Sequence, residues 1–280
     1  MQKSGKTKYQ LFLIANLKKE LKTALELDSQ KIATEIEKIG FSCQQCGKCC
    51  KRAFGDNRVA VIPMEIEKIR TYTGLSKLEV AGPLIPELFN SFEASPLLKE
   101  TEENSEKSTD ISDSDLFEHP EEILDSQGNI HAFGWMLRKK RNGDCIFLEE
   151  STKKCRVYPA RPMLCRTYPF YLENLKLYIS ECEGLGYLIS KEESQKLAKA
   201  LLFRYISELE DTLGMYEKFE NFENENKDSK FNRRNATNSG NAKNSKNSEN
   251  TKHSENTKYS EKSGRTYIVH DSSGSVKIFE

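Results

Sequence analysis

The sequence lacks any long apolar run. None of its stretches approaches the ~20 apolar residues of a membrane-spanning helix. The apolar stretch nearest the N-terminus, Leu11 to Ala15, is shorter than the ~7–15-residue core of a signal peptide, and Lys18, Lys19 and Glu20 soon follow it. We therefore expect a protein without a membrane role that stays in the cytoplasm.

Two further shortages limit the function classes. Lys plus Arg and Asp plus Glu number 43 each, so no overall charge of one sign favours nucleic acid or an anionic membrane as a partner. The sequence also has no phosphate-binding P-loop, no dinucleotide-binding glycine motif followed by a plausible acidic residue, no His-Glu-x-x-His zinc motif and no serine nucleophile elbow. These absences leave the catalytic residues, if there are any, unknown.

Apolar residues are also scarce, at 36% against a usual share of about 45–50%. Part of the chain therefore cannot bury a core. We expect a flexible acidic insert near 99–115 and a disordered linker over 221–264, where a six-residue pattern repeats imperfectly at Ser248 and Ser254. Residues 266–280 alternate in polarity around a Ser-Ser-Gly turn and predict a β-hairpin, which would be only marginally stable alone.

The N-terminal 8–40 segment predicts two helices. Leu13, Leu17 and Leu21 fall at helical spacing, and a second apolar phase begins at Ile32 after a polar break. Asp28 or Ser29 would cap the second helix, and Gly40 would end it. We interpret the segment as an amphipathic helical hairpin that packs on the rest of the protein, with a partner-binding helix as the alternative.

The following segment mixes strands and helices. The pattern predicts strands at 58–62, 130–139, 145–148 and 175–180, a helix after Pro63 that ends at Gly74, and a helix over 191–216. The sequence thus indicates an α+β fold. We expect a small cysteine-rich mixed domain, flanked by the N-terminal helical hairpin and a C-terminal helix, with a disordered tail. The metal-binding domain, counted with the C-terminal helix, spans 41–216.

Cysteine carries the chemistry of this sequence. All eight cysteines fall between residues 43 and 182. Four form the compact motif Cys43-x2-Cys46-x2-Cys49-Cys50, and four are spread further along the chain: Cys145, Cys155, Cys165 and Cys182. In a reducing compartment such grouped thiols bind metal more often than they form disulfides or pack as free thiols. Eight thiols would make two sites of four, each suited to zinc or to an iron–sulfur cluster, of which 4Fe–4S is favoured.

The spacing of the compact motif has a physical reason. Two residues between cysteines allow a tight turn that directs two sulfurs at one ion, and Gly47 can adopt a backbone conformation that points nearby N–H groups at sulfur. Cys49 would be a third ligand. Because adjacent side chains rarely share one tetrahedral centre, we expect Cys50 to reach a different centre from Cys49, or to bind in an unusual geometry.

Basic residues surround both cysteine groups. Between 138 and 166 there are nine lysines and arginines against three acidic residues. Such cations would offset the charge of a thiolate centre, and four are candidates to lie next to the ligands: Lys48, Arg156, Arg161 and Arg166. The alternative is a basic surface for nucleic acid or phosphate. The four histidines do not lie at ligand spacing from a cysteine, so we predict that none is a ligand.

These motifs resemble a known family. The segment from Phe41 to Cys50 is similar to the opening motif of the YkgJ-like cysteine-cluster family, described as a zinc- or iron-chelating domain. The match continues through Gly143 to Leu148, Cys155 to Pro162 and Cys165 to Phe170. The resemblance spans about 41 to 182 and implies a small mixed α/β domain with all eight cysteines as metal ligands. The long acidic insert departs from the family pattern.

Three functions follow as hypotheses. The first is a metal- or cluster-binding protein with a redox role, because family members are often described as iron–sulfur oxidoreductases. The second, by family analogy alone, is a protein-lysine N-methyltransferase, since the family is also associated with lysine methylation of flagellin. The third is a structural zinc module that binds a protein partner through the helices at 8–39 or 191–216.

Overall fold

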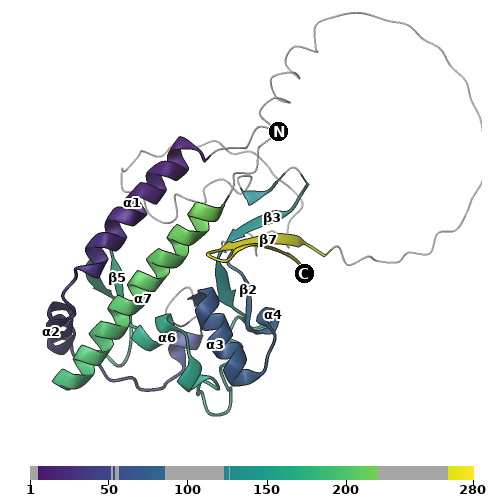
Figure 1. Ribbon diagram of the computed structural model, residues 1–280. Coiled ribbons are helices and arrows are strands. Elements are labelled where there is room, and N and C mark those ends of the chain that lie inside the picture. The colour runs from purple at the N-terminus through teal and green to yellow at the C-terminus, as the bar shows by residue number, and fades with distance from the viewer. Residues whose placement is uncertain (1–5, 52, 54–56, 86–122, 126, 220–263) are drawn as a thin grey trace, which may run out of the picture.

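The fold is α+β, with small sheets distributed among the helices (Figure 1). The structure is a computed structural model that describes residues 6–51, 53, 57–85, 123–125, 127–219 and 264–280. The predicted acidic insert near 99–115 and almost all of the predicted linker at 221–264 lie outside these ranges. Within them, no helix has the length and apolar character needed to cross a membrane.

The N-terminal segment forms the two predicted helices, α1 (Lys8–Leu25) and α2 (Ser29–Ile39). The break between them is local in origin, because the Asp28 carboxylate accepts a hydrogen bond from the Gln30 N–H and caps α2. Gly40 ends α2 with a positive φ of 75°. The two helices do not pair mainly with each other, as a hairpin would. Both pack on the long helix α7 (Lys191–Lys218).

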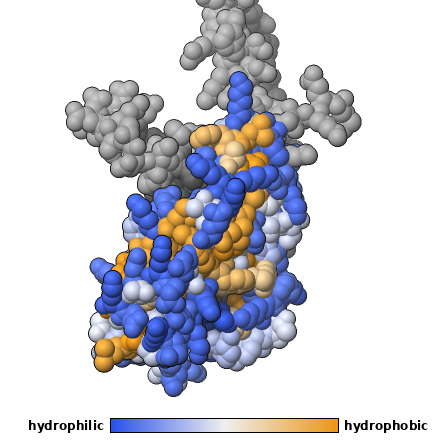
Figure 2. All heavy atoms as spheres, turned by 60° about the vertical axis from the view of Figure 1, so that its left-hand side comes forward, coloured by the Kyte–Doolittle hydropathy of each residue, from blue (hydrophilic) through white to orange (hydrophobic). Residues whose placement is uncertain are grey.

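The first hydrophobic core lies between these three helices and a β-hairpin. Strands β5 (Phe170–Glu173) and β6 (Lys176–Ile179) pair antiparallel, and β6 falls within the strand predicted at 175–180. Phe170 and Ile36 are fully buried in this core. On the outer side of α1, Tyr9, Leu11 and Phe12 are exposed, and Figure 2 shows apolar surface gathered on this side of the molecule.

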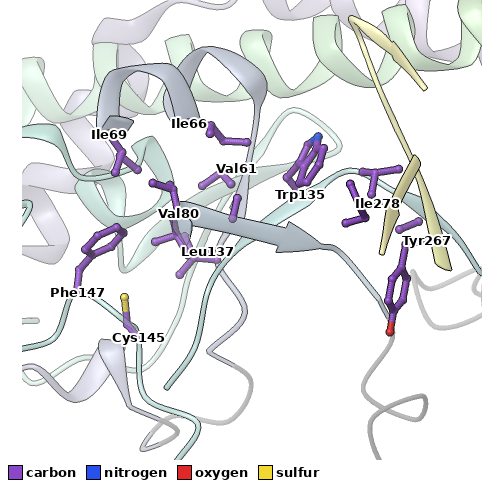
Figure 3. Close-up of a cluster of buried hydrophobic side chains, with 14 of the residues drawn as sticks. Val61, Ile66, Ile69, Val80, Trp135, Leu137, Cys145, Phe147, Tyr267 and Ile278 are labelled. Carbon is purple, nitrogen blue, oxygen red and sulfur yellow. The ribbon is translucent and has the colours of Figure 1, made fainter. Parts of the chain in front are cut away.

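A second core surrounds a three-stranded antiparallel sheet. Its strand order is β1 (Ala60–Val61), β4 (Trp135–Leu137) and β2 (Ala81–Pro83). The predicted helix after Pro63 is α3 (Pro63–Thr73), ended by Gly74 with a positive φ, and the short α4 (Lys77–Val80) follows. Figure 3 shows side chains of α3 beside those of this sheet, with Trp135 between them and the side chains of the C-terminal hairpin.

The strand predicted at 130–139 is instead two strands. Gly134, at a φ of 113°, separates β3 (Ile130–Phe133) from β4. The two halves pair with different partners, since β4 lies between β1 and β2 while β3 pairs with the C-terminal strand β7 (Thr266–Asp271). The single-strand prediction was therefore wrong at the glycine, where the backbone conformation allows the chain to pass from one sheet to the other.

The C-terminal hairpin predicted at 266–280 is present as β7 and β8 (Gly274–Phe279). It does not stand alone. Strand β7 pairs in parallel with β3, and Val269 is fully buried in the second core. The pairing of segments about 135 residues apart gives the hairpin the third strand and the buried face that an isolated hairpin lacks.

Candidate metal centre

All eight cysteines line one cavity of about 270 Å³. The cavity brings together the compact motif at 43–50 and the four cysteines at 145–182, which are separated by about a third of the chain. None of the eight forms a disulfide. The convergence of the two groups, which the sequence could only suggest, is a feature of the fold.

The compact motif wraps around one wall of the cavity. Cys43 and Cys46 lie in a loop, and Cys49 and Cys50 lie in a short 3-10 helix, Lys48–Cys50. Gly47 precedes this helix in the left-handed conformation, with a φ of 72°. A side-chain carbon at Gly47 would lie 2.8 Å from the Lys153 carbonyl oxygen. Glycine is therefore required here both for its φ and for the close approach of the second cysteine group.

Backbone hydrogen bonds join the second cysteine group to the first. The Cys145 N–H donates to the Cys50 carbonyl oxygen at 2.9 Å. The strand predicted at 145–148 is absent, because this segment makes only two isolated bridges, from Cys145 to Lys139 and from Leu148 to Cys155. Short irregular segments replace a strand here, and they hold Cys145 and Cys155 at the cavity.

Cys182 reaches the cavity from a third direction. It follows β6, and the Ser42 N–H donates to the Gly184 carbonyl oxygen at 2.9 Å, which ties this loop to the start of the compact motif. A side-chain carbon at Gly184 would lie 2.3 Å from the Ser42 carbonyl oxygen. The Gly184 N–H also points at the Cys182 sulfur, at 3.4 Å. Backbone N–H donors of this kind stabilise a thiolate.

Cys165 lies on the short helix α6 (Met163–Thr167), which follows the 3-10 turn Tyr158–Ala160. The N-terminus of α6 is anchored by the buried carboxylate of Glu65 on α3, which accepts a hydrogen bond from the Met163 N–H at 2.5 Å. Cys165 thus depends on α3 for its position. Nothing in the local sequence pattern marked Glu65 for this role.

Hydrogen bonds between neighbouring thiols shift their pKa values. Cys50 hydrogen-bonds to both Cys49 and Cys145, and these contacts raise its own pKa. The same contact with Cys50, helped by the charge of Arg161, lowers the pKa of Cys49 to about 7. The hydrogen bond from Cys50 also lowers the pKa of Cys145. Cys50, which belongs to the compact motif, therefore contacts both its neighbour Cys49 and Cys145 of the second cysteine group.

Burial is the main cause of the pKa shift at three other thiols. It raises the pKa of Cys155 and Cys182, and it raises that of Cys165 well above its ordinary value. Across the described residues, no three or more His, Cys, Asp or Glu side chains form a group that could hold a single metal ion. The partition of the eight cysteines into two sites of four therefore stays a prediction.

The four basic residues singled out from the sequence occupy different places. Arg161 lines the cavity and stacks on the Tyr158 ring at 3.9 Å. Lys48 forms an ion pair with Glu183, while Arg156 donates to the Ile146 carbonyl oxygen. Arg166 donates to two backbone carbonyls beside Arg161. Three other cations line the cavity, namely Arg58, Lys153 and Lys154.

Two cavity residues were not singled out by sequence reasoning as part of the site. The Asn57 amide donates to the carbonyl oxygens of Cys50 and Gly143, at 3.3 and 2.9 Å, so it links the two cysteine groups. Tyr168 lines the cavity, and its pKa rises to about 12 because of burial and the neighbouring Cys182. Tyr168 falls in the segment from Cys165 to Phe170 that resembles the family, and the sequence around Asn57 carries no signal for its role.

Comparison with known proteins gives a family. Residues 42–200 match the model of the CxxCxxCC family, described as a putative zinc- or iron-chelating domain. The chain belongs to this family. The match extends beyond the last cysteine into α7, so the family domain includes part of the helix on which α1 and α2 pack.

A curated relative and the solved structures add little beyond this. An uncharacterized protein of Methanocaldococcus jannaschii, MJ0661, is 35% identical over 78 residues, which cover 24% of this chain and 43% of that relative. The match thus spans less than half the length of MJ0661. No solved structure matches the chain.

Proposed function

We propose that this protein holds an iron–sulfur cluster in the cysteine cavity and uses it to transfer electrons. The observation that carries the proposal is that all eight cysteines line one cavity of about 270 Å³. A donor set made only of thiolates suits iron–sulfur clusters and zinc, and membership of a zinc- or iron-chelating family agrees with both. The proposal includes a reducing location in the cytoplasm, where the thiols would stay available.

The number of sulfurs favours a cluster over a single zinc ion, because eight thiols line one cavity. A structural zinc site needs four donors about 2.3 Å from one point. Eight thiols are more than one such ion can bind. A cluster of several iron and sulfur atoms fills a larger volume and separates its cysteine ligands more widely. Thiols distributed around a cavity suit that kind of centre.

The charge of the cavity supports an anionic centre. Arg58, Lys153, Lys154 and Arg161 line the cavity, and no carboxylate is among its described lining residues. A cluster with four thiolate ligands carries net negative charge, which these cations would offset. Cys50 and Asn57, which contact both cysteine groups, would hold the ligands from the two halves of the chain in register.

Elemental and optical analysis of the full chain, purified without oxygen, tests the proposal. We expect iron and acid-labile sulfide in similar amounts, a brown colour, and loss of that colour on reduction with dithionite. A colourless protein with stoichiometric zinc and no sulfide would overturn the redox role.

A structural zinc module is the second candidate. It is favoured by the irregular backbone of the cysteine segments, where Cys43, Cys46, Cys155 and Cys182 lie outside regular helices and strands. A metal could hold such segments together because its binding energy adds to folding. In that case a chelator would unfold a colourless zinc protein. No feature of the described residues favours the N-methyltransferase hypothesis, and we do not propose it.

A further inference from the structure

A second cavity, of about 260 Å³, lies between α3, α6 and α7. It borders the cysteine cavity, because Arg161 lines both. No cysteine lines it. Its charged lining residues are three cations and one carboxylate: Lys68, Arg161, Arg166 and Glu65.

The carboxylate is already engaged with the backbone. One oxygen of Glu65 accepts the Met163 N–H at 2.5 Å, and the other accepts the Ile62 N–H at 3.0 Å. Both donors lie at the starts of helices, where N–H groups have no partner within the helix. Glu65 therefore satisfies the protein's own donors, and its charge offsets only part of the positive charge at Lys68.

Among the residues that the structure describes, none of the three cations forms a salt bridge with a carboxylate. Arg166 donates to the carbonyl oxygens of Arg161 and Pro159, at 2.8 and 2.7 Å, which fixes its guanidinium group without neutralising it. Partial burial and the charge of Arg166 lower the pKa of Lys68, and the Glu65 carboxylate offsets only part of this shift. Like charges held close together favour an anion that can relieve their repulsion.

The rest of the cavity is apolar. Met64 and Phe203 line it and are 53% and 56% exposed, so they also contact solvent. Ala160 and Ala200 contribute small side chains to the wall. A cavity of this size lies just below the range of about 300–1,000 Å³ found for larger ligands, so its occupant would be a small molecule.

We propose that this second cavity binds a small molecule with one anionic group, such as a phosphate, sulfate or carboxylate, attached to a flat apolar group. The anionic group contacts Lys68 and Arg166, and the apolar group contacts Phe203 and Met64. The proposal does not rest on the metal centre, because none of the residues that carry it is a cysteine. Arg161 would make the ligand a neighbour of that centre.

Calorimetry with the full chain tests the proposal, with phenyl phosphate, inorganic phosphate and phenol as probes. We expect phenyl phosphate to bind more tightly than inorganic phosphate, phenol to bind least, and added salt to weaken both phosphates. Lys68→Ala should weaken phosphate binding at least about 5-fold, a loss of about 1 kcal/mol, and Lys68→Glu should abolish it. Phe203→Ala should weaken phenyl phosphate more than inorganic phosphate.

The matched control is Lys196→Ala, which removes an exposed lysine of α7 that does not line the cavity. It should leave the affinity for phenyl phosphate unchanged. Absence of phosphate binding by the unmodified chain would overturn the proposal. So would equal affinity in the Lys68→Ala variant and the unmodified chain, provided that both melt at the same temperature.

Discussion

His131 Nδ1 lies 2.8 Å from His270 Nε2, although 139 residues separate the two in sequence. His131 Nε2 lies 3.3 Å from the Asp125 carboxylate, which can only accept, so this nitrogen carries the proton. His131 Nδ1 then accepts from His270 Nε2–H, and His270 Nδ1 accepts from the Ser275 hydroxyl at 2.7 Å. A directed chain of hydrogen bonds, in which both imidazole rings are neutral, thus joins the C-terminal hairpin to β3.

Acid should weaken this junction. Burial and the neighbouring His131 lower the pKa of His270 from 6.5 to about 4. Between pH 6.5 and pH 4 the unfolded chain therefore binds a proton that the folded chain does not, so the free energy of unfolding falls as the pH falls. The full effect of His270, reached below pH 4, is about 3 kcal/mol. Asp125, with a pKa of about 2, stays ionised throughout this interval.

Urea unfolding at a series of pH values between 4 and 8 measures this effect. The His270→Asn variant is the comparison, because all other titrating groups remain in it. We expect the unfolding free energy of the variant to depend less steeply on pH between 6.5 and 4. Parallel curves for the two proteins would show that His270 does not titrate as the buried junction requires.

Asp271 should anchor the same hairpin through the single tryptophan. Its carboxylate is buried and accepts a hydrogen bond from Trp135 Nε1 at 2.7 Å, and the Lys77 ammonium lies 3.6 Å away. Asp271→Ala would leave the buried indole N–H without an acceptor, and we expect a loss of about 3 kcal/mol in unfolding free energy. Urea unfolding followed by tryptophan fluorescence measures this loss in the free energy of unfolding. Lys277→Ala, at an exposed position of the same hairpin, should change the stability little.

The sequence predicted best those features that depend on neighbouring residues. Asp28 caps the start of α2 by a local hydrogen bond, and Gly40 ends the helix through its own backbone conformation. Both ends of α2 could therefore be predicted from the sequence. The C-terminal hairpin follows from its alternation and its turn. The pairing of β7 with β3 could not be predicted, because it joins distant segments through backbone groups that every residue shares. The division of the 130–139 strand at Gly134 depends on that same pairing.

The residues of the candidate site also fall into those that the sequence identified and those that it did not. The cysteines were identifiable because thiols have a distinct chemistry, and the structure brings all eight to one cavity. Asn57 and Glu65 were not identified, since they act on backbone groups that become neighbours only in the folded chain. The prediction of a strand at 145–148 failed because the Cys145 N–H donates to the Cys50 carbonyl oxygen and the segment forms only isolated bridges, not a regular pairing with another strand.

Replacing a central thiol should remove metal and stability together. Cys50 hydrogen-bonds to Cys49 and Cys145, and Cys46 belongs to the same motif. Either Cys46→Ser or Cys50→Ser should lower the metal content of the purified protein and its Tm, because metal binding contributes to folding. Elemental analysis and thermal unfolding measure both. Ser151→Ala, in an exposed turn, is the control, and unchanged metal stoichiometry in both cysteine variants would contradict the proposed centre.

Gly47 offers a test of the cavity that leaves every sulfur in place. Gly47 and Gly128 have similar positive φ values, 72° and 78°, so alanine costs about 1 kcal/mol of backbone strain at each. Only at Gly47 would the added carbon lie 2.8 Å from a backbone oxygen, that of Lys153, whereas Gly128 has no atom within 4 Å of that position. Gly47→Ala should therefore lower stability by about 1–2 kcal/mol more than Gly128→Ala. Because the clash separates the two cysteine groups, Gly47→Ala alone should also lower the metal content. Equal metal content in the two variants would mean that the close approach of residues 47 and 153 is not needed to form the centre.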